Sequence, residues 1–389
     1  MKVILIVLIS FAADFGCVSE ENMMQLYIEK LHSDNPKEQV NAVDGLLRRG
    51  EKGIDSLARN LKGGREAAEF LARHWDGIDK FIKDGRYSEI MIGEARPLHI
   101  AVAKNYSDAV KLLIAKGADI RGKTNHSNSH TPLSVAAHYG RVDIARYLVS
   151  KGVGVNEWQY YPGHTLLHEA AANGNAHFVE FLIENGADIH AETYKGSMPI
   201  HFANGEAIRA LVELGEDVNA EGFAGQRPLH THQNREDASL LLDFGADIEA
   251  KDSGGCTPLH YAAESEKIDF IKFLIENGAD INARDNVKRT ALHRIIRNID
   301  FQTKDTIVTL IELGAEINAK DSQGKTPLHL AVECSVLKEN ALLLIEKGAD
   351  LNAVDNEGKT PLEYADEEIK SLLRSHSAKT GKELQKEGK

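Results

Sequence analysis

A short motif recurs along most of this chain, and it constrains the fold more than any other feature. The run Thr257-Pro258-Leu259-His260-Tyr261-Ala262 returns almost unchanged as Thr326-Pro327-Leu328-His329-Leu330-Ala331. Variants of the motif begin at Arg96, Thr131, Thr165, Met198, Arg227, Thr290 and Thr360. Eight copies are followed by an apolar stretch and then a closing glycine, at Gly117, Gly152, Gly186, Gly215, Gly245, Gly278, Gly314 and Gly348. These glycines are 29 to 36 residues apart, so a unit of this length is repeated nine times within residues 91–374.

The best-preserved copy predicts a pair of helices. Thr257 can cap the first helix, and Pro258 fits its first turn because the missing N–H has no partner there. The apolar residues of 268–275 favour a second helix, which Gly278 ends in a left-handed conformation. One helix pair cannot bury both of its faces, so the repeats are expected to stack into an all-α solenoid.

A period near 33 residues with Thr-Pro-Leu-His resembles the ankyrin repeat. The resemblance implies an ankyrin-repeat solenoid over residues 91–374, with short β-turn or hairpin tips between the helix pairs. It also implies a non-enzymatic protein that binds a protein partner through the tips and first helices of a concave face. Repeats four and five are short, and residues 300–304 are inserted into repeat seven. We expect these departures to change only the local curvature.

The first 19 residues are typical of an export signal. Lys2 precedes the apolar run 3–11 and the small residues Ala12 and Ala13, as in a secretory signal peptide. The run is too short to cross a bilayer, which needs ~20 apolar residues. We therefore expect an exported, periplasmic or secreted protein without a membrane span; a buried first helix is the alternative. Cys17 leaves open a lipid anchor.

Two further segments flank the repeats. Residues 20–90 lack the motif but keep a helical periodicity, and part of them weakly resembles a HEAT-type helix pair. We expect this segment to form an N-terminal cap on the first repeat. The tail 375–389 is polar and has no apolar periodicity, which predicts disorder.

Charge and motif content exclude several classes of function. The chain has a net charge of −13, and residues 91–374, with 29 basic and 42 acidic side chains, carry this excess. Such a surface repels phosphate backbones, so nucleic acid is not an expected partner. We find no nucleophile elbow, P-loop or HExxH motif. We therefore predict no enzyme, no catalytic residues and no cofactor.

The histidines and cysteines predict neither a metal site nor a disulfide. Seven histidines share one motif position: His99, His168, His201, His230, His260, His293 and His329. Layers ~8–10 Å apart keep their rings from converging on one ion, so each is expected to hydrogen-bond the neighbouring turn. Cys256 and Cys334 are two repeats apart, too far for a disulfide.

Aromatic residues mark the candidate binding surface. Most tips are polar, as at Gln323 and Glu357, but the one that leads into repeat three contains Trp158, Tyr160 and Tyr161. The next tips carry Tyr194 and Phe223, and nearby first helices add Tyr139, Phe202 and Tyr261. Because tyrosine and tryptophan are favoured interface anchors, we predict that these eight residues form the partner-binding stripe of a monomer.

Three alternatives to this binding hypothesis stay open at the sequence level. Trp158 and Tyr160 could pack under their own loop, without contacting a partner. The protein could be a passive structural scaffold, which predicts tolerance of changes at the tips. It could also protect or deliver a periplasmic enzyme, which predicts one stoichiometric enzyme partner.

Overall fold

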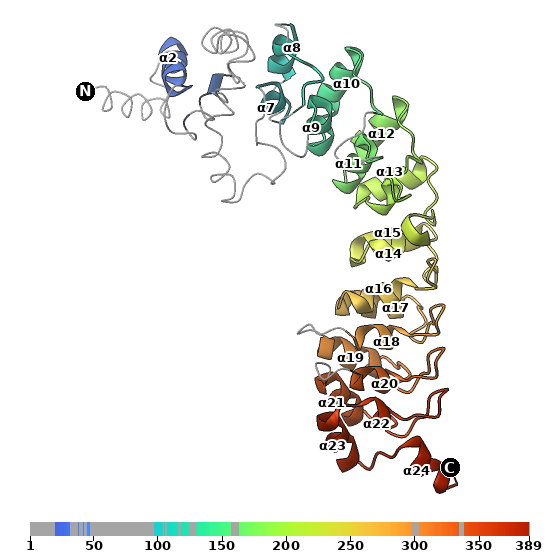
Figure 1. The fold of residues 1–389 in the computed structure, drawn as a ribbon. Helices are drawn as coiled ribbons and strands as arrows, with labels where there is room; N and C mark the ends of the chain where they lie inside the picture. The colour runs from blue at the N-terminus through green and yellow to red at the C-terminus, as the bar shows by residue number, and fades with distance from the viewer. Residues whose placement is uncertain are drawn as a thin grey trace, which may run out of the picture. The chain divides into compact units, whose positions relative to one another are not determined.

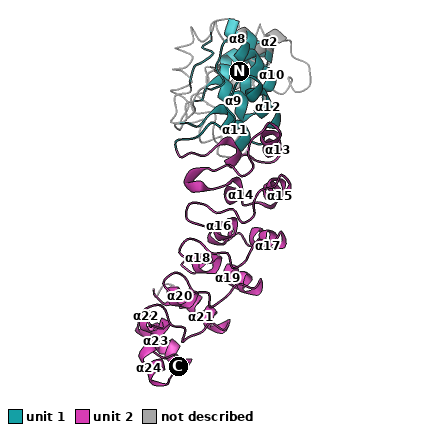
Figure 2. Ribbon diagram, turned by 90° about the vertical axis from the view of Figure 1, so that its right-hand side faces the viewer, with its two compact units in different colours: residues 1–194 teal, residues 195–389 magenta. Residues whose placement is uncertain are grey.

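The computed structural model describes residues 20–31, 38, 42, 45–46, 97–103, 105, 107–115, 118–123, 130–156, 163–297, 303–333 and 338–388. These residues form helices joined by turns (Figure 1). The chain divides into two compact units, residues 1–194 and 195–389 (Figure 2). The predicted all-α solenoid of helix pairs is confirmed within each unit.

In the described part of unit 1, three helix pairs follow helix α2 and the helical residues 38, 42 and 45–46. The helices are α2 (Glu20–Leu31), α7 (Pro97–Ala103), α8 (Ser107–Ala115), α9 (Pro132–His138), α10 (Val142–Ser150), α11 (Leu166–Ala172) and α12 (Ala176–Glu184). The first helices of its repeats contact one another in the order α7, α9, α11, and the second helices in the order α8, α10, α12. Repeats one to three therefore stack as expected.

Among its described residues, unit 2 contains six helix pairs, the 3-10 turn η2 on one tip, and a final short helix. The helices are η1 (Pro199–His201), α13 (Glu206–Glu213), η2 (Phe223–Gly225), α14 (Pro228–Thr231), α15 (Arg235–Asp243), α16 (Pro258–Glu264), α17 (Ile268–Glu276), α18 (Ala291–Ile295), α19 (Thr303–Glu312), α20 (Pro327–Val332), α21 (Lys338–Glu346), α22 (Pro361–Tyr364), α23 (Glu367–Ser375) and α24 (Gly381–Lys386). The first helices lie in one layer and the second helices in another (Figure 2).

The motif residues act as the sequence predicted. In repeat six, Thr257 is the N-cap of α16 in an extended conformation, and Pro258 follows at the start of the helix. Leu259 and the two alanines after Tyr261 are fully buried, so the small side chains let neighbouring helices approach closely. Gly278 has a φ of 95°, in the left-handed region, and this ends α17.

The tips that lead into repeats six to nine are tight turns held by an aspartate. In the tip that leads into repeat eight, Asp321 Oδ1 accepts the backbone N–H groups of Gln323 and Lys325, both at 2.9 Å. The backbone N–H of Asp321 donates to the Lys325 carbonyl (2.9 Å), which closes a small hairpin-like turn. Successive tips are also joined, because the Ser322 N–H donates to the Val287 carbonyl of the preceding tip (2.8 Å). The predicted β-turn or hairpin tips are thus present between these repeats.

The shortened repeats keep the fold by shortening their first helices. In repeat four the first helix is only the 3-10 turn η1, and in repeat five α14 has four residues, against seven in α16. The insertion predicted at 300–304 overlaps the start of α19 at Thr303. The length changes are therefore absorbed before the second helix, and the stacking order is preserved.

The C-terminal tail was predicted to be disordered, and this prediction was wrong. Thr380 and Glu383 form a capping box that starts α24, and Arg374 forms an ion pair with Glu383 at 2.8 Å. The Gly381 N–H donates to Glu363 of repeat nine (2.9 Å). Hydrogen bonds and a helix cap thus order this polar segment, and apolar periodicity cannot detect either of them.

Several predictions fall on residues outside the described part of the chain. They are the signal peptide of residues 1–19 with Cys17, most of the HEAT-like segment, and Cys334. Within that segment, Ala42 and Leu46 are described, and both are helical and buried. No helix among the described residues is long and apolar enough to span a membrane.

Candidate partner-binding surface

The motif histidines fix the first helices, which form one side of the candidate surface. The Thr257 N–H donates to His260 Nδ1 (3.1 Å), and His260 Nε2 donates to the Arg289 carbonyl of the next repeat (3.0 Å). In the same way, at 3.0 to 3.3 Å, Nε2 donates to a backbone carbonyl of the next repeat in three other cases: from His230 to Cys256, from His293 to Lys325 and from His329 to Lys359. These bonds confirm the prediction that His230, His260, His293 and His329 hydrogen-bond the neighbouring turn.

Burial sets the protonation state of these rings. It lowers the pKa of five of them: His201, His230, His260, His293 and His329. Their Nδ1 atoms accept a backbone N–H, as at His260, so the neutral ring carries its proton on Nε2. A neutral ring in this tautomer satisfies one donor and one acceptor of the buried backbone at once.

Two tyrosines brace the tips from the first helices. The Tyr261 hydroxyl donates to Asp252 Oδ2 (2.7 Å) and accepts from Gln226 Nε2 (2.8 Å). Tyr364 donates in the same way to Asp355 (2.5 Å). Each tyrosine follows its aspartate by nine residues. The half-buried Tyr261 therefore holds a tip in place, a role that its position in the predicted stripe did not indicate.

Two predicted anchors of unit 2 lie at the surface. Phe223 is 46% exposed on the tip that precedes repeat five, and Phe202 is 38% exposed after η1. The Lys195 ammonium lies 5.0 Å from the centre of the Phe223 ring. The Phe223 backbone is held by turn η2 and by a hydrogen bond to Ser197 (3.3 Å). The tip therefore presents an aromatic ring on a fixed backbone.

Unit 1 contributes the other candidates. Tyr194 is 67% exposed, whereas Tyr139 is half-buried, with its ring edge-on to His138. The remaining three predicted anchors, Trp158, Tyr160 and Tyr161, lie outside the described residues. The structure thus brings Phe202, Phe223 and Tyr261 onto consecutive repeats of unit 2 and gives two further aromatic residues in unit 1.

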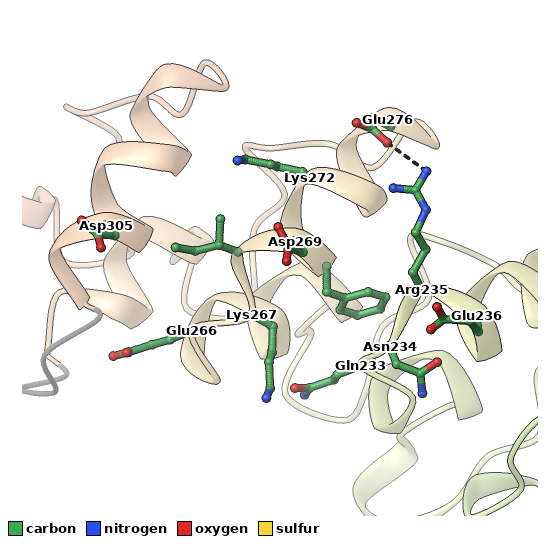
Figure 3. A pocket seen from close by; sticks show the side chains of 12 residues that line it. Gln233, Asn234, Arg235, Glu236, Glu266, Lys267, Asp269, Lys272, Glu276 and Asp305 are labelled. Carbon is green, nitrogen blue, oxygen red and sulfur yellow. Dashed lines mark ion pairs between the residues drawn. The ribbon is translucent and has the colours of Figure 1, made fainter.

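A depression of about 770 Å³ lies on the other side of unit 2, where α15 and α17 begin (Figure 3). Both signs of charge line it, with Arg235 bound to Glu276 (3.6 Å) and with Lys267 and Asp269 from the start of α17. Because its charges are mixed, the depression favours neither anions nor cations.

Cys256 is a buried free thiol at the first-helix side of repeat six. Arg294 Nη1 lies 3.2 Å from its Sγ, while the rest of the guanidinium binds Glu264. Burial raises the pKa of Cys256 to about 11, so the thiol stays protonated at neutral pH and is a weak nucleophile. Among the described residues, no group of three histidine, cysteine or acidic side chains could hold a metal ion.

These observations define a repeat protein of stacked helix pairs whose tips and first helices form an ordered surface. The family of ankyrin repeats (3 copies) matches in overlapping segments: 60–157, 98–193, 155–222, 200–285, 229–321 and 292–382. The chain belongs to the ankyrin-repeat family. The match begins inside the segment for which the sequence predicted a HEAT-like cap.

Relatives with ankyrin repeats match parts of this chain. An ankyrin repeat protein of fowlpox virus (strain NVSL) is 31% identical over 106 residues, which is 27% of this chain and 31% of the viral protein. Ankyrin repeat and SOCS box protein 6 of Homo sapiens is 32% identical over 186 residues, 46% of this chain and 40% of the relative. The B-cell lymphoma 3 protein homolog of Mus musculus is 30% identical over 111 residues, 28% and 24% of the two chains. The chain thus spans less than half the length of each relative.

Proposed function

We propose that this protein is an exported binding module whose ankyrin repeats bind a protein partner through their tips and first helices. Ankyrin repeats are protein-interaction modules, which supports the general role. The proposed anchors are the aromatic residues of repeats two to six: Tyr139, Trp158, Tyr160, Tyr161, Tyr194, Phe202, Phe223 and Tyr261.

The exposed ring of Phe223 carries this proposal. A large apolar side chain on an ordered tip gains little from folding, because nearly half of it stays in water. The energetic gain comes when a partner covers it, and aromatic rings are frequent hot spots of interfaces. Phe202 supports the same surface from the neighbouring first helix, since it too is exposed.

Photo-cross-linking in the native cell tests this function and captures the partner in the same step. A photoreactive amino acid in place of Phe223 should give one dominant protein adduct. The matched control position is Lys272, which is exposed on the second helix α17, and it should not give that adduct. Absence of a specific adduct at Phe223 would favour a passive scaffold, whereas an enzyme as the adduct would favour the accessory role.

Export is part of the proposal, and it rests on Lys2 and the apolar run 3–11. N-terminal sequencing of the native protein should find a mature chain that begins between residues 13 and 20. An intact Met1 in a cytoplasmic fraction would contradict export but would leave the binding function standing.

A further inference from the structure

Three cations occupy equivalent positions at the bases of consecutive tips in unit 2. Lys251, Arg284 and Lys320 each stand immediately before a tip aspartate. Each side chain reaches one repeat further and donates to the backbone carbonyl at the same position there. Lys251 Nζ binds Arg284 O (3.2 Å), Arg284 Nη1 binds Lys320 O (2.9 Å), and Lys320 Nζ binds Val354 O (2.7 Å). We call these three residues the cation row.

The charges of the cation row are largely available to a partner. A carbonyl takes one hydrogen of a lysine ammonium, which has three, and it carries no formal charge. In the described part of the chain, Lys251 and Lys320 form no ion pair. Arg284 pairs with Glu316 at 3.3 Å, but both side chains are exposed, so this pair is weak.

The tip aspartates do not offset the row at the surface. Asp285 and Asp321 are buried, and Oδ1 of Asp285 is occupied by the backbone N–H groups of Val287 (3.0 Å) and Arg289 (2.8 Å). Asp252 is half-buried, but both of its oxygens are occupied, by the backbone N–H groups of Gly254 and Cys256 (2.8 Å each) and by the Tyr261 hydroxyl (2.7 Å). Val287 and Val354 are 45% and 39% exposed. The row therefore combines three fixed cations with two apolar side chains on the neighbouring tips.

The row is narrow and has defined ends. Glu221 stands at the equivalent position before it and Val354 at the one after it, so it contains three charges and no more. Exposed carboxylates of Asp247, Asp280 and Glu316 lie four residues before the three cations. Residues 195–389 as a whole carry 24 basic and 34 acidic side chains. A broad polyanion such as a bilayer or a nucleic-acid duplex would meet these carboxylates, whereas a single extended chain need not.

From this arrangement we infer that the cation row binds an extended acidic segment of the partner, with a carboxylate at every third residue. Successive helix layers lie ~8–10 Å apart, and three residues of a polyproline II helix span ~9 Å. That helix has three residues per turn, so carboxylates at i, i+3 and i+6 lie on one side of it. A β-strand alternates its faces every two residues, ~6.8 Å apart, and fits this spacing poorly.

The inference rests on the proposed protein-binding function and can be tested separately from it. The probe is a labelled peptide of three consecutive Glu-Pro-Pro units, and its control has the same composition with the three glutamates adjacent. Fluorescence polarisation on the full chain should show at least ~10-fold tighter binding of the spaced peptide. This binding should weaken with added salt, as expected of exposed charges.

Charge reversal locates the site. The double variant Lys251→Glu/Lys320→Glu should weaken binding of the spaced peptide by more than ~10-fold, whereas Lys272→Glu on the exposed face of α17 should change it by less than ~2-fold. Thermal melts check that the variants fold, and Lys251→Ala/Lys320→Ala serves as a second variant where the reversed pair does not.

Four outcomes would overturn the inference: equal binding of the two peptides, no binding of either, equal loss in the control variant, or tighter row-dependent binding of anionic vesicles or duplex DNA. If the partner cross-linked at Phe223 binds normally to the double variant, the inference fails while the proposed function stands. Loss of partner binding on reversal of the row, with Phe223 still cross-linked in the wild type, supports both.

Discussion

Removing the imidazole of His260 should destabilise unit 2 through one orphaned backbone N–H and one lost bond between repeats. His260→Ala leaves the Thr257 N–H without its acceptor (3.1 Å) and removes one of the two bonds to the Arg289 carbonyl (3.0 Å), which keeps the backbone N–H of Asp285 (3.0 Å). Thr257 and His260 are both fully buried, so water cannot easily replace these bonds. The unsatisfied N–H costs ~1–3 kcal/mol and the lost second bond to the carbonyl ~0.5–1.5 kcal/mol, so together they predict a loss of ~1.5–4.5 kcal/mol.

Urea unfolding followed by circular dichroism at neutral pH measures this loss. His260→Gln should cost less, because a side-chain carbonyl can accept the Thr257 N–H as Glu363 accepts the Thr360 N–H in repeat nine (3.0 Å). His177 is the matched control, since its side chain is 90% exposed, and His177→Ala should cost less than ~0.5 kcal/mol. If His260→Ala falls within that same range, the histidine links do not stabilise the stack.

Two further predictions concern stability. Burial lowers the pKa of motif histidines such as His260, whereas the same histidines in the unfolded chain have a pKa of ~6.5. Below that pH the unfolded chain therefore binds more protons than the folded chain. The free energy of unfolding should be highest above pH ~6.5 and should fall as the pH drops below it. A urea midpoint that is unchanged or higher at pH ~5.5 than at pH ~7.5 would contradict this. Deletion of residues 377–389 removes the bonds to Thr360 and Glu363 and should cost ~1–3 kcal/mol; an unchanged urea midpoint would show that α24 does not cap the stack.

The repeat motif was sufficient to predict the helix pairs that the structure describes in residues 97–375. Thr257, Pro258 and Gly278 each have a single physical role in a helix pair, and the structure places them in it. The histidine role was also predictable, because one residue type recurred at one position while the layer spacing excluded a shared metal ion. In these cases the local chemistry of the motif residues and their repetition along the chain were enough to predict their structural role.

The C-terminal cap was missed because its signal is polar. Ser377 has a φ of 71° and takes the place of a closing glycine, and Ala378 then bonds to Leu373 as Ala349 bonds to Leu344. The cap therefore imitates the start of another repeat without the motif or its apolar residues. The Thr380-x-x-Glu383 capping box was visible in the sequence, but only the structure shows that it packs on repeat nine.

The candidate surface was harder to predict than the fold. Tyr261 and Phe202 are both aromatic residues of first-helix segments, yet Tyr261 bonds to Asp252 while Phe202 stays exposed. The nine-residue spacing between Asp252 and Tyr261, repeated at Asp355 and Tyr364, could have indicated the brace. The cation row depends on contacts between repeats, whereas the composition of the chain indicates only a net negative charge.

Titration of the cross-linked partner with variants of the tips tests the account most directly. Phe223→Ala and Trp158→Ala should each weaken binding by ~2 kcal/mol or more, as expected of aromatic hot spots, without lowering the thermal midpoint. Gln323→Ala, on an exposed polar tip, should change binding by less than ~0.5 kcal/mol. Equal losses in all three variants, or no loss in any, would contradict binding through the aromatic tips.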